Sequence, residues 1–435
     1  MSDLKVSVVS RPFESTITPP GSKSLTNRAM VLAALAGGVS ELKNCLFADD
    51  TLVMLDSLGR LGFMLDVDRA TNSIRIHGRA GKVPAESAEL FCGNSGTTIR
   101  FLTALCTLGT GPYVLDGVGR MRQRPIGQLV DLLRNYAARI DYRMAEGFPP
   151  IEVRGGGISG GIARFGRAQS SQFLSALLQV CPYARHEAKI DLEPGQTSWP
   201  YVAMTMQLMG EFGILTELER DPKTNQPTRI HVPQGVYHPA IYNVEPDASA
   251  ASYFLAAAAI HPGAKVTIAG LGNRSLQGDV GFADVLRKMG AQVTMKPDSL
   301  TVSGTDELEG IDIDMGDMPD VAMTLAVVAL FARGPMRISG LHTLRHKETD
   351  RLSALATELR KFAAEARIED DALIIRPPAK PTGAEIDTYE DHRMAMSFAV
   401  AGTRVPDVTI RNAGCVNKTY PSFFDDLRRV THTQE

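Results

Sequence analysis

The sequence predicts a mixed α/β protein whose six repeats group as two domains of three. First, a short helix that ends at a small residue and leads into a strand recurs about every 75 residues, and its small residues are Gly62, Ala137, Gly213, Gly290 and Ala363, with a sixth helix in FFDDLRRV. Second, a helix rich in Ala and Leu falls between these copies, starting near Ser22, Asn94, Ser170, Asp247, Asp317 and Asp391. Third, 435 residues suit two or three domains.

The elements follow from local patterns in chain order. Residues 4–9 and 15–18 read as strands, and residues 19–21 (PPG) break the chain. Apolar residues recur at spacings of three and four over 22–36, which predicts a helix that Gly37 and Gly38 end. Alternating apolar residues predict the strands that close successive repeats, at 73–78, 150–155, 228–233, 299–304 and 372–377.

The expected domain boundary lies in the two-proline segment 237–246, after three repeats. This predicts a first domain over 21–240 and a second over 1–20 plus 241–435. If the first strand pairs with the C-terminal half, the chain crosses between the domains near 20 and near 240. Two crossings form a natural hinge, and hinged closure commonly excludes water from reactive substrates.

Composition narrows the class of protein. Net charge is −3, which does not favour a nucleic-acid surface, and 44% hydrophobic with 22% charged residues is ordinary for a soluble globular protein. Five widely spaced cysteines without a CxxC pair indicate reduced, buried thiols in a cytoplasmic protein. The N-terminus lacks a signal-peptide pattern, and no apolar stretch is long enough to span a bilayer.

Polar strings open several helices where apolar packing does not require them. The clearest are GSKSLTNR (21–28), GNSGTTIR (93–100), QSSQF (169–173), HKETDR (346–351) and EDHRMA (390–395). Helix N-termini suit phosphate and carboxylate, so the strings suggest a site for more than one anion. Taken alone, GSKSLTNR and QSSQF are about equally well explained as helix caps, and HKETDR is better explained as a solvated charged turn. Lys23 argues for an anion, because a cation in the first helical turn opposes the helix dipole.

Other charged segments have two interpretations each. The arginines of RMRQRP (120–125) form either a solvated basic loop or a lid that delivers an arginine to an anion. Asp317 and Asp320, with the charged turn at 347–351, could supply general bases or simply face solvent. A lone His392 is more often structural than catalytic, and no spacing of His and Cys supports a metal.

Taken together, in this order and spacing, the strings resemble the 5-enolpyruvylshikimate-3-phosphate synthase (3-phosphoshikimate 1-carboxyvinyltransferase) family. The likeness covers essentially the whole chain and includes RPIGQLVD, DASAASYFLAAAAI, YEDHRMAM and NKTYPSFF. It implies two domains of three βαβαββ units around buried helices, an inside-out α/β barrel. It also implies enolpyruvyl transfer from phosphoenolpyruvate to shikimate 3-phosphate by addition and elimination, without metal or organic cofactor, in a monomer.

The resemblance assigns binding roles residue by residue. Shikimate 3-phosphate would be held by Lys23, Ser24, Arg28, Ser170, Ser171 and Ser198, with Tyr201 nearby in SWPY and with Asp320 and Lys347 on the ring hydroxyls. Phosphoenolpyruvate would be bordered by Asn94 and Gly96, shared with Lys23 and Gln172, and neutralised by Arg124, Arg351, Arg393 and Lys418. Glyphosate is expected to compete there, because the family's sensitive members carry glycine at the position of Gly96.

The resemblance also assigns catalysis. Asp320 would accept a proton, with Glu348 and Lys23 as partners in proton transfer at the methylene carbon. Thr343 stands where an asparagine often contacts the shikimate ring, and Phe101 where many members have proline. Two alternatives are a UDP-N-acetylglucosamine enolpyruvyl transferase, which typically carries a cysteine in the loop equivalent to 110–124, and a pseudo-sixfold clamp-like scaffold. This chain has no cysteine in that loop.

Overall fold

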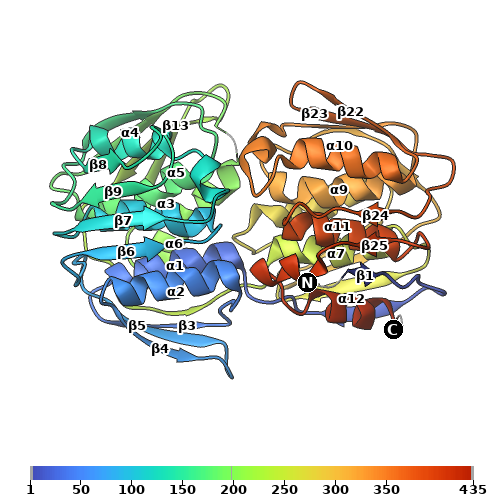
Figure 1. The fold of residues 1–435 in the computed structure, drawn as a ribbon, viewed down its shortest axis with the longest axis horizontal. Helices are drawn as coiled ribbons and strands as arrows, with labels where there is room; N and C mark the ends of the chain where they lie inside the picture. The colour runs from blue at the N-terminus through green and yellow to red at the C-terminus, as the bar shows by residue number, and fades with distance from the viewer. Residues whose placement is uncertain (1–2, 197, 433–435) are drawn as a thin grey trace. The chain divides into compact units, whose positions relative to one another are not determined.

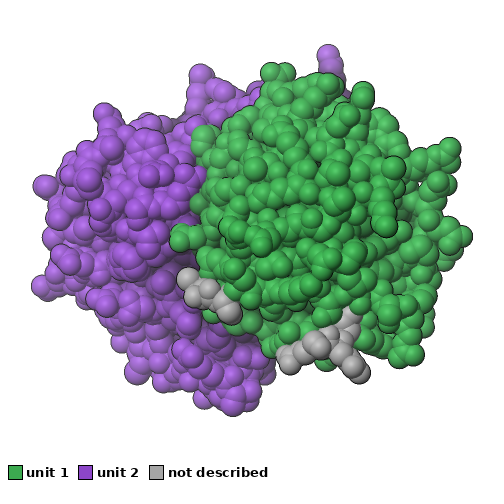
Figure 2. Space-filling view, turned by 45° about the vertical axis from the view of Figure 1, so that its right-hand side comes forward, with its two compact units in different colours: residues 1–20, 245–435 green, residues 21–244 purple. Residues whose placement is uncertain are grey.

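The computed structural model describes residues 3–196 and 198–432, and the chain divides into the two compact units coloured in Figure 2. Unit 1 comprises Met1–Pro20 and Glu245–Glu435, and unit 2 comprises Gly21–Val244. Both units are built from small mixed sheets and from buried helices, so the fold is of the α/β class.

Unit 2 contains three four-stranded sheets with one connection pattern (Figure 1). In each sheet the first two strands are parallel, and an antiparallel hairpin completes it. The orders are β14-β3-β5-β4, β6-β7-β9-β8 and β10-β11-β13-β12. The strands are β3 (Val39–Lys43), β4 (Met64–Asp68), β5 (Ser73–His77), β6 (Ala88–Phe91), β7 (Pro112–Asp116), β8 (Arg139–Tyr142), β9 (Ile151–Arg154), β10 (Gly161–Phe165), β11 (Ala188–Leu192), β12 (Glu217–Arg220), β13 (Pro227–Val232) and β14 (Ile241–Asn243).

Unit 1 repeats this pattern twice and closes with smaller sheets. The orders are β16-β17-β15-β2, β19-β21-β23-β22, β1-β25-β24 and β18-β20. The strands are β1 (Leu4–Lys5), β2 (Glu14–Ile17), β15 (Lys265–Ala269), β16 (Gln292–Met295), β17 (Ser299–Ser303), β18 (Leu308–Glu309), β19 (Asp312–Asp314), β20 (Ala332–Arg333), β21 (Met336–Ser339), β22 (Glu365–Glu369), β23 (Ala372–Arg376), β24 (Glu385–Ile386) and β25 (Thr409–Ile410).

Some sheets take a strand from a distant part of the chain: in unit 1, β1 pairs with β25 and β2 with β15, and in unit 2, β14 pairs with β3. β2 pairs in parallel with β15, with Lys265 opposite Glu14, and β14 pairs in parallel with β3, with Ile241 opposite Glu41. These pairings require the chain to pass from one unit to the other twice. The passages fall after Pro20 and after Val244.

Three buried helices form the centre of each unit. In unit 2, α3 contacts both α1 and α5, and in unit 1, α7, α9 and α11 contact one another (Figure 1). The helix that follows the second strand of a repeat has a smaller share of buried residues than the central helices. It exposes one face to solvent. The helices are α1 (Lys23–Leu35), α2 (Asp49–Arg60), α3 (Gly96–Cys106), α4 (Gly127–Asn135), α5 (Ser171–Val180), α6 (Trp199–Glu211), α7 (Ala248–Ala259), α8 (Phe282–Lys288), α9 (Ala322–Val328), α10 (Arg351–Lys361), α11 (His392–Gly402) and α12 (Phe423–Thr431).

The repeat signal is confirmed in the backbone. All five small residues that end the repeated helix have positive φ: 85° at Gly62, 64° at Ala137, 86° at Gly213, 110° at Gly290 and 66° at Ala363. A left-handed residue after the last turn is a common helix end, since it turns the chain toward the next strand. The helix expected over 22–36 and the five expected strands are also present.

Several local expectations are wrong. The polar string NKTYP (417–421) predicts the start of the last helix, but it does not open that helix: Lys418 ends the 3-10 helix η7 (Ala413–Lys418), and α12 begins at Phe423. Proline disfavours helical backbone at the residue before it, so Pro421 delays the start. Pro125, a residue type that favours the first helical position, is likewise not helical, because α4 begins at Gly127 and Ile126 (φ −134°, ψ −5°) occupies the N-cap position. The first strand covers only Leu4–Lys5.

Two expectations about class can be compared with the structure. Among the described residues, no helix is both long and apolar enough to cross a membrane. All five cysteines are free; four are buried, whereas Cys415 is half-buried. Burial raises the pKa of Cys45 to about 12, so this thiol stays protonated near neutral pH and is a weak nucleophile.

Candidate functional site

The three central helices of unit 2 all begin with an uncharged cap. The hydroxyls of Ser22, Ser95 and Ser170 accept from the backbone N–H of Leu25, Thr98 and Gln172, at 3.4, 3.4 and 3.3 Å. A serine cap satisfies one N–H without cancelling the positive end of the helix dipole. All three helix starts therefore remain suited to an anion.

Lys23 and Arg28 lie on successive turns of α1. Lys23 Nζ is 3.3 Å from Asp50 Oδ2, and both side chains are largely buried. Arg28 is 1% exposed; it donates to Ser24 O at 3.0 Å, to Thr205 Oγ1 at 2.7 Å, and to Ser175 Oγ and Tyr201 O. Arginine has five N–H donors, so these four bonds leave at most one for a ligand.

The Arg28 guanidinium also lies 5.1 Å from the centre of the Phe101 ring. A ring face attracts a cation, which gives the unusual Phe101 a role inside unit 2. Burial lowers the pKa of Arg28 to about 10, and Arg28 still carries its charge at neutral pH.

Asn94, Gly96 and Arg124 come together at the start of α3. Arg124 Nη1 donates to Asn94 O at 2.9 Å and to Asn94 Oδ1 at 3.2 Å, and the arginine is 4% exposed. A Cβ on Gly96 would lie 2.5 Å from Arg124 Nη2, which is closer than real Cβ contacts. Gly96 therefore leaves room for this guanidinium.

The two other arginines of the basic loop have different partners among the described residues. Arg122 pairs with Asp116 (Nε–Oδ1 3.0 Å), and Arg120 donates to Gln123 Oε1 at 3.3 Å. Arg122 thus forms an ion pair within the protein, and the interpretation of the loop as a lid stays a prediction.

Arg100 also belongs to this group of charged side chains in unit 2, although the sequence pattern assigned no role to it. Its Nη1 donates to Gln172 Oε1 at 2.7 Å and to Ser170 Oγ at 3.2 Å, while Nη2 donates to Pro125 O. Gln172 Nε2 in turn donates to Thr97 Oγ1 at 3.3 Å, and the partly exposed Ser171 follows the cap. Arg100 ends the GNSGTTIR string, so its place in that motif was the available signal.

Ser198 and Tyr201 lie at the start of α6. Ser198 has a left-handed φ of 54° and is 5% exposed; residue 197 lies outside the described residues. Tyr201 meets Arg28 through its backbone oxygen, which also accepts from Thr205 at 2.9 Å. Its phenol is partly exposed.

The second group of charges lies in unit 1 around Asp320, in the 3-10 helix η4 (Pro319–Val321). Asp320 Oδ1 accepts from Lys347 Nζ at 3.1 Å and from Arg351 Nη1 at 3.3 Å, and Oδ2 accepts from Arg393 Nη2 at 3.1 Å. Its side chain is 17% exposed. Burial lowers the pKa of Lys347, and the Asp320 carboxylate opposes that effect.

Arg351, the first residue of α10, links three carboxylates. Besides Asp320, it donates to Asp391 through Nε (2.7 Å) and Nη2 (3.1 Å), and to Glu348 Oε2 at 2.8 Å. Burial by itself lowers the pKa of Arg351, but Asp391, Glu348 and Asp320 together raise it. Lys418 Nζ lies 3.8 Å from Glu348 Oε1.

Tyr253 is a second member that the sequence did not indicate. Its hydroxyl accepts from Arg393 Nη1 at 3.3 Å, and burial raises the pKa of the phenol to about 12 even though Arg393 lowers it. Tyr253 lies in the apolar sequence of α7, where a tyrosine is expected to belong to the hydrophobic core. Thr343, in η6 (His342–His346), is 3% exposed, and its hydroxyl has no hydrogen-bond partner in the described part of the chain.

Each group carries an excess of positive charge. The unit 2 cluster sets four cations against Asp50: Lys23, Arg28, Arg100 and Arg124. The unit 1 cluster sets Lys347, Arg351, Arg393 and Lys418 against Asp320, Glu348 and Asp391. No group of three or more His, Cys, Asp or Glu side chains suited to a metal ion occurs in residues 3–196 and 198–432.

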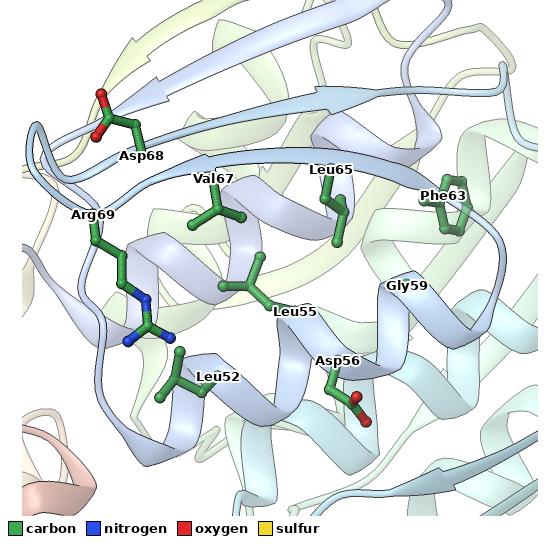
Figure 3. Close-up of a pocket in the computed structure, with 9 residues that line it drawn as sticks. All are labelled: Leu52, Leu55, Asp56, Gly59, Phe63, Leu65, Val67, Asp68 and Arg69. Carbon is green, nitrogen blue, oxygen red and sulfur yellow. The ribbon is translucent and has the colours of Figure 1, made fainter.

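A hollow elsewhere in unit 2 does not share this chemistry. Its volume is about 850 Å³, and it opens between α2 and β4, where Leu52, Leu55, Leu65 and Val67 point toward one another (Figure 3). Its lining has one cation, Arg69, and two carboxylates. A polyanion is therefore better matched to the cationic clusters than to this hollow.

Comparison with known proteins gives one consistent result. Residues 9–427 match the family described as EPSP synthase (3-phosphoshikimate 1-carboxyvinyltransferase). The 3-phosphoshikimate 1-carboxyvinyltransferase of Yersinia pseudotuberculosis is 46% identical over 419 residues, 96% of each chain, and that of Trichormus variabilis 41% over 426 residues, 98% of each. An EPSP synthase structure from Acinetobacter baumannii superposes with a TM-score of 0.81 at 26% identity, covering 99% of this chain and 98% of that one. The enolpyruvyl transferase NikO from Streptomyces tendae shares the fold at 17% identity, TM-score 0.77, with coverage of 98% and 97%.

Proposed function

This chain belongs to the EPSP synthase (3-phosphoshikimate 1-carboxyvinyltransferase) family, and we propose that it transfers the enolpyruvyl group of phosphoenolpyruvate to the 5-hydroxyl of shikimate 3-phosphate, releasing phosphate. Both substrates are polyanions. The excess of cations in each cluster supports this assignment, because preorganised positive charge stabilises anions and the charge that develops during reaction.

The observation that carries the mechanism is the Asp320 carboxylate, held by three cations yet partly exposed. A positioned carboxylate can take the proton of an attacking hydroxyl. We assign that role to Asp320. As the hydroxyl adds to phosphoenolpyruvate, the methylene carbon gains a proton; loss of phosphate and of a methyl proton from the tetrahedral intermediate then restores the double bond.

Glu348 and Lys23 are the proposed partners for the carbon proton. Glu348 is 9% exposed and is oriented by Arg351, and Lys23 is oriented by Asp50. Lys347 keeps contact with Asp320, where it can donate to a ring hydroxyl. The buried hydroxyl of Thr343 is proposed to take the ring contact that an asparagine commonly makes.

The remaining side chains are proposed to bind the anionic groups. Ser24, Ser170, Ser171, Ser198 and Tyr201 would surround the phosphate of shikimate 3-phosphate, and Gln172 would lie between the substrates. Asn94, Gly96, Arg124, Arg393 and Lys418 would hold phosphoenolpyruvate. Arg28 would act chiefly by ordering Ser24 and Tyr201, because its N–H groups are mostly engaged by the protein.

Phosphate release tests the proposal directly. Release should require both shikimate 3-phosphate and phosphoenolpyruvate, with no product when either is omitted. Release with UDP-N-acetylglucosamine in place of shikimate 3-phosphate would instead support the other enolpyruvyl transfer. The monomeric state and the cytoplasmic location remain predictions; sedimentation equilibrium and cell fractionation check them.

A further inference from the structure

The turn that precedes α11 is held in a strained conformation. Tyr389 and Glu390 both have left-handed backbone, with φ of 54° and 56°. Left-handed backbone is unfavourable for a non-glycine residue, and such residues persist only where the surroundings hold them. The next residue, Asp391, caps α11 and is fully buried.

Glu358 supplies the contacts that hold this turn. Its side chain is fully buried; Oε1 accepts from Tyr389 Oη at 2.8 Å, and Oε2 accepts from the Asp387 backbone N–H at 3.1 Å. Lys361 Nζ lies 2.7 Å from Glu358 Oε2 and donates to Asp387 Oδ2 at 2.8 Å. The buried carboxylate of Glu358 is thus hydrogen-bonded to Asp387 and to Tyr389, at the start of the turn over 387–391.

The same helix face binds the other end of the turn. Arg351 and Glu358 are seven residues apart on α10, about two helical turns, so they project in nearly the same direction. Arg351 is bonded to Asp391, and Glu358 to Asp387 and Tyr389. Burial, followed by the Glu358 carboxylate, raises the pKa of Tyr389, which keeps its hydroxyl a donor.

We propose that Glu358 is a positioning residue: by fixing the 387–391 turn it sets the place of Asp391, which holds Arg351 where Arg351 contacts Glu348 and Asp320. Its effect on rate rests on the proposed function. Glu358 touches neither Glu348 nor Asp320 through any described hydrogen bond, so it acts through Asp391 and Arg351.

Three variants and one control test this inference in the full-length protein. Glu358→Ala removes both bonds to the turn, and Tyr389→Phe removes only one, at a 41% exposed residue that folding tolerates. Glu358→Gln keeps both, because its amide oxygen can accept from Asp387 N–H and its amide nitrogen can donate to Tyr389 Oη. Leu355→Ala, on the same helix and fully buried, lowers stability without removing a hydrogen bond to the turn.

We expect kcat to fall about 10²-fold in Glu358→Ala, the scale of a small misplacement of reacting groups. Tyr389→Phe should fall less, and Glu358→Gln should retain most of the activity. Leu355→Ala should lose melting temperature but keep kcat per folded molecule. Unchanged kcat in Glu358→Ala and Tyr389→Phe, or loss in Glu358→Gln equal to that in Glu358→Ala, would overturn the proposal.

A crystal structure of Glu358→Ala supplies a measurement that does not depend on activity. The separation of Arg351 Nε from Asp391 Oδ2, now 2.7 Å, should exceed hydrogen-bonding distance. An unchanged separation overturns the proposal even if kcat falls. If the wild-type protein released no phosphate, the proposed function would fail, while this distance would still decide whether Glu358 positions the turn.

Discussion

At the scale of single residues, the proposed role of Asp320 as proton acceptor can be tested directly by substitution. Its two oxygens are shared among Lys347, Arg351 and Arg393. Replacing it with asparagine keeps its size but removes its ability to accept a proton. We expect Asp320→Asn to lower kcat by about 10²–10⁴, the usual worth of a general base.

The control for that variant is Asp298→Asn, an exposed aspartate of the same unit. It should leave kcat unchanged. Steady-state phosphate release with both substrates measures both variants. Should Asp320→Asn keep its kcat and raise KM instead, Asp320 binds substrate and another group accepts the proton.

Gly96 gives a second prediction at this scale. A methyl group there meets the Arg124 guanidinium at 2.5 Å, and that group is buried and bonded to Asn94. Such overlap costs about 1–3 kcal/mol. Gly96→Ala should therefore raise KM for phosphoenolpyruvate by roughly 5- to 150-fold, with tenfold per 1.4 kcal/mol, and it should weaken glyphosate more than it weakens phosphoenolpyruvate.

Gly59→Ala is the matched control, because no atom lies within 4 Å of its added Cβ. It should leave KM and glyphosate inhibition unchanged. The informative quantity is the ratio of the glyphosate inhibition constant to the KM of phosphoenolpyruvate in both variants. Equal ratios in wild type and Gly96→Ala would remove Gly96 from the glyphosate pocket.

At the scale of elements, the basic loop over 120–124 contains Arg124, which we propose holds phosphoenolpyruvate, and Arg122, which pairs with Asp116. Arg124→Gln loses charge-assisted hydrogen bonds worth about 1.5–3 kcal/mol, so KM for phosphoenolpyruvate should rise by about one to two powers of ten. Arg122→Gln should leave KM unchanged, since Arg122 contacts Asp116. Parallel measurement of KM for both variants checks the division, and a raised KM in Arg122→Gln would contradict it.

The Arg122–Asp116 pair also predicts a dependence on pH. The hydrogen bond from Arg122 lowers the pKa of Asp116 below its ordinary 3.8. The resulting stability is present above about pH 3.8 and is lost as the pH falls through the lower folded value. Arg122→Gln should thus be slightly less stable than wild type at neutral pH, and the difference in melting temperature should shrink in acid.

The repeated helix ends predict an unusual sign for one substitution. Ala363 has a φ of 66°, where three equivalent positions carry glycine. Relief of the left-handed cost of about 1–2 kcal/mol exceeds the extra unfolded-state entropy of about 0.4–1 kcal/mol. Ala363→Gly should raise the melting temperature, whereas Ala354→Gly, inside the same α10, should lower it. A fall in both would show that Ala363 is not strained.

At the scale of the whole molecule, each unit is complete only with the strand that it takes from a distant part of the chain, which is β14 in unit 2. The fragment 21–244 keeps β14, whereas 21–240 lacks it and leaves the edge of β3 unpaired. We expect the longer fragment to unfold cooperatively at a higher denaturant midpoint than the shorter one. Circular dichroism in urea measures both; equal midpoints would mean that β14 contributes nothing to unit 2.

The organisation into repeats was readable because it depends on short-range patterns. Gly62, Gly213 and Gly290 mark helix ends, and Ala137 and Ala363 were found only because the period placed them in line with the glycines. The start of α12 could not be read in the same way, because Lys418 and the residues after it adopt a 3-10 turn before Pro421. Helix ends of this kind are set by packing as well as by propensity.

The sequence by itself determined the repeat, most of its elements and the caps of the central helices of unit 2, since caps, glycines and apolar spacing act within about one helical turn. Only the tertiary structure decided which groups hydrogen-bond to the arginines. Arg28 donates to Thr205 and Tyr201, Arg100 donates to Ser170, and Arg393 donates to Tyr253. These partners lie 70 or more residues apart. Their contact depends on how the repeats close around the central helices, which no local pattern encodes.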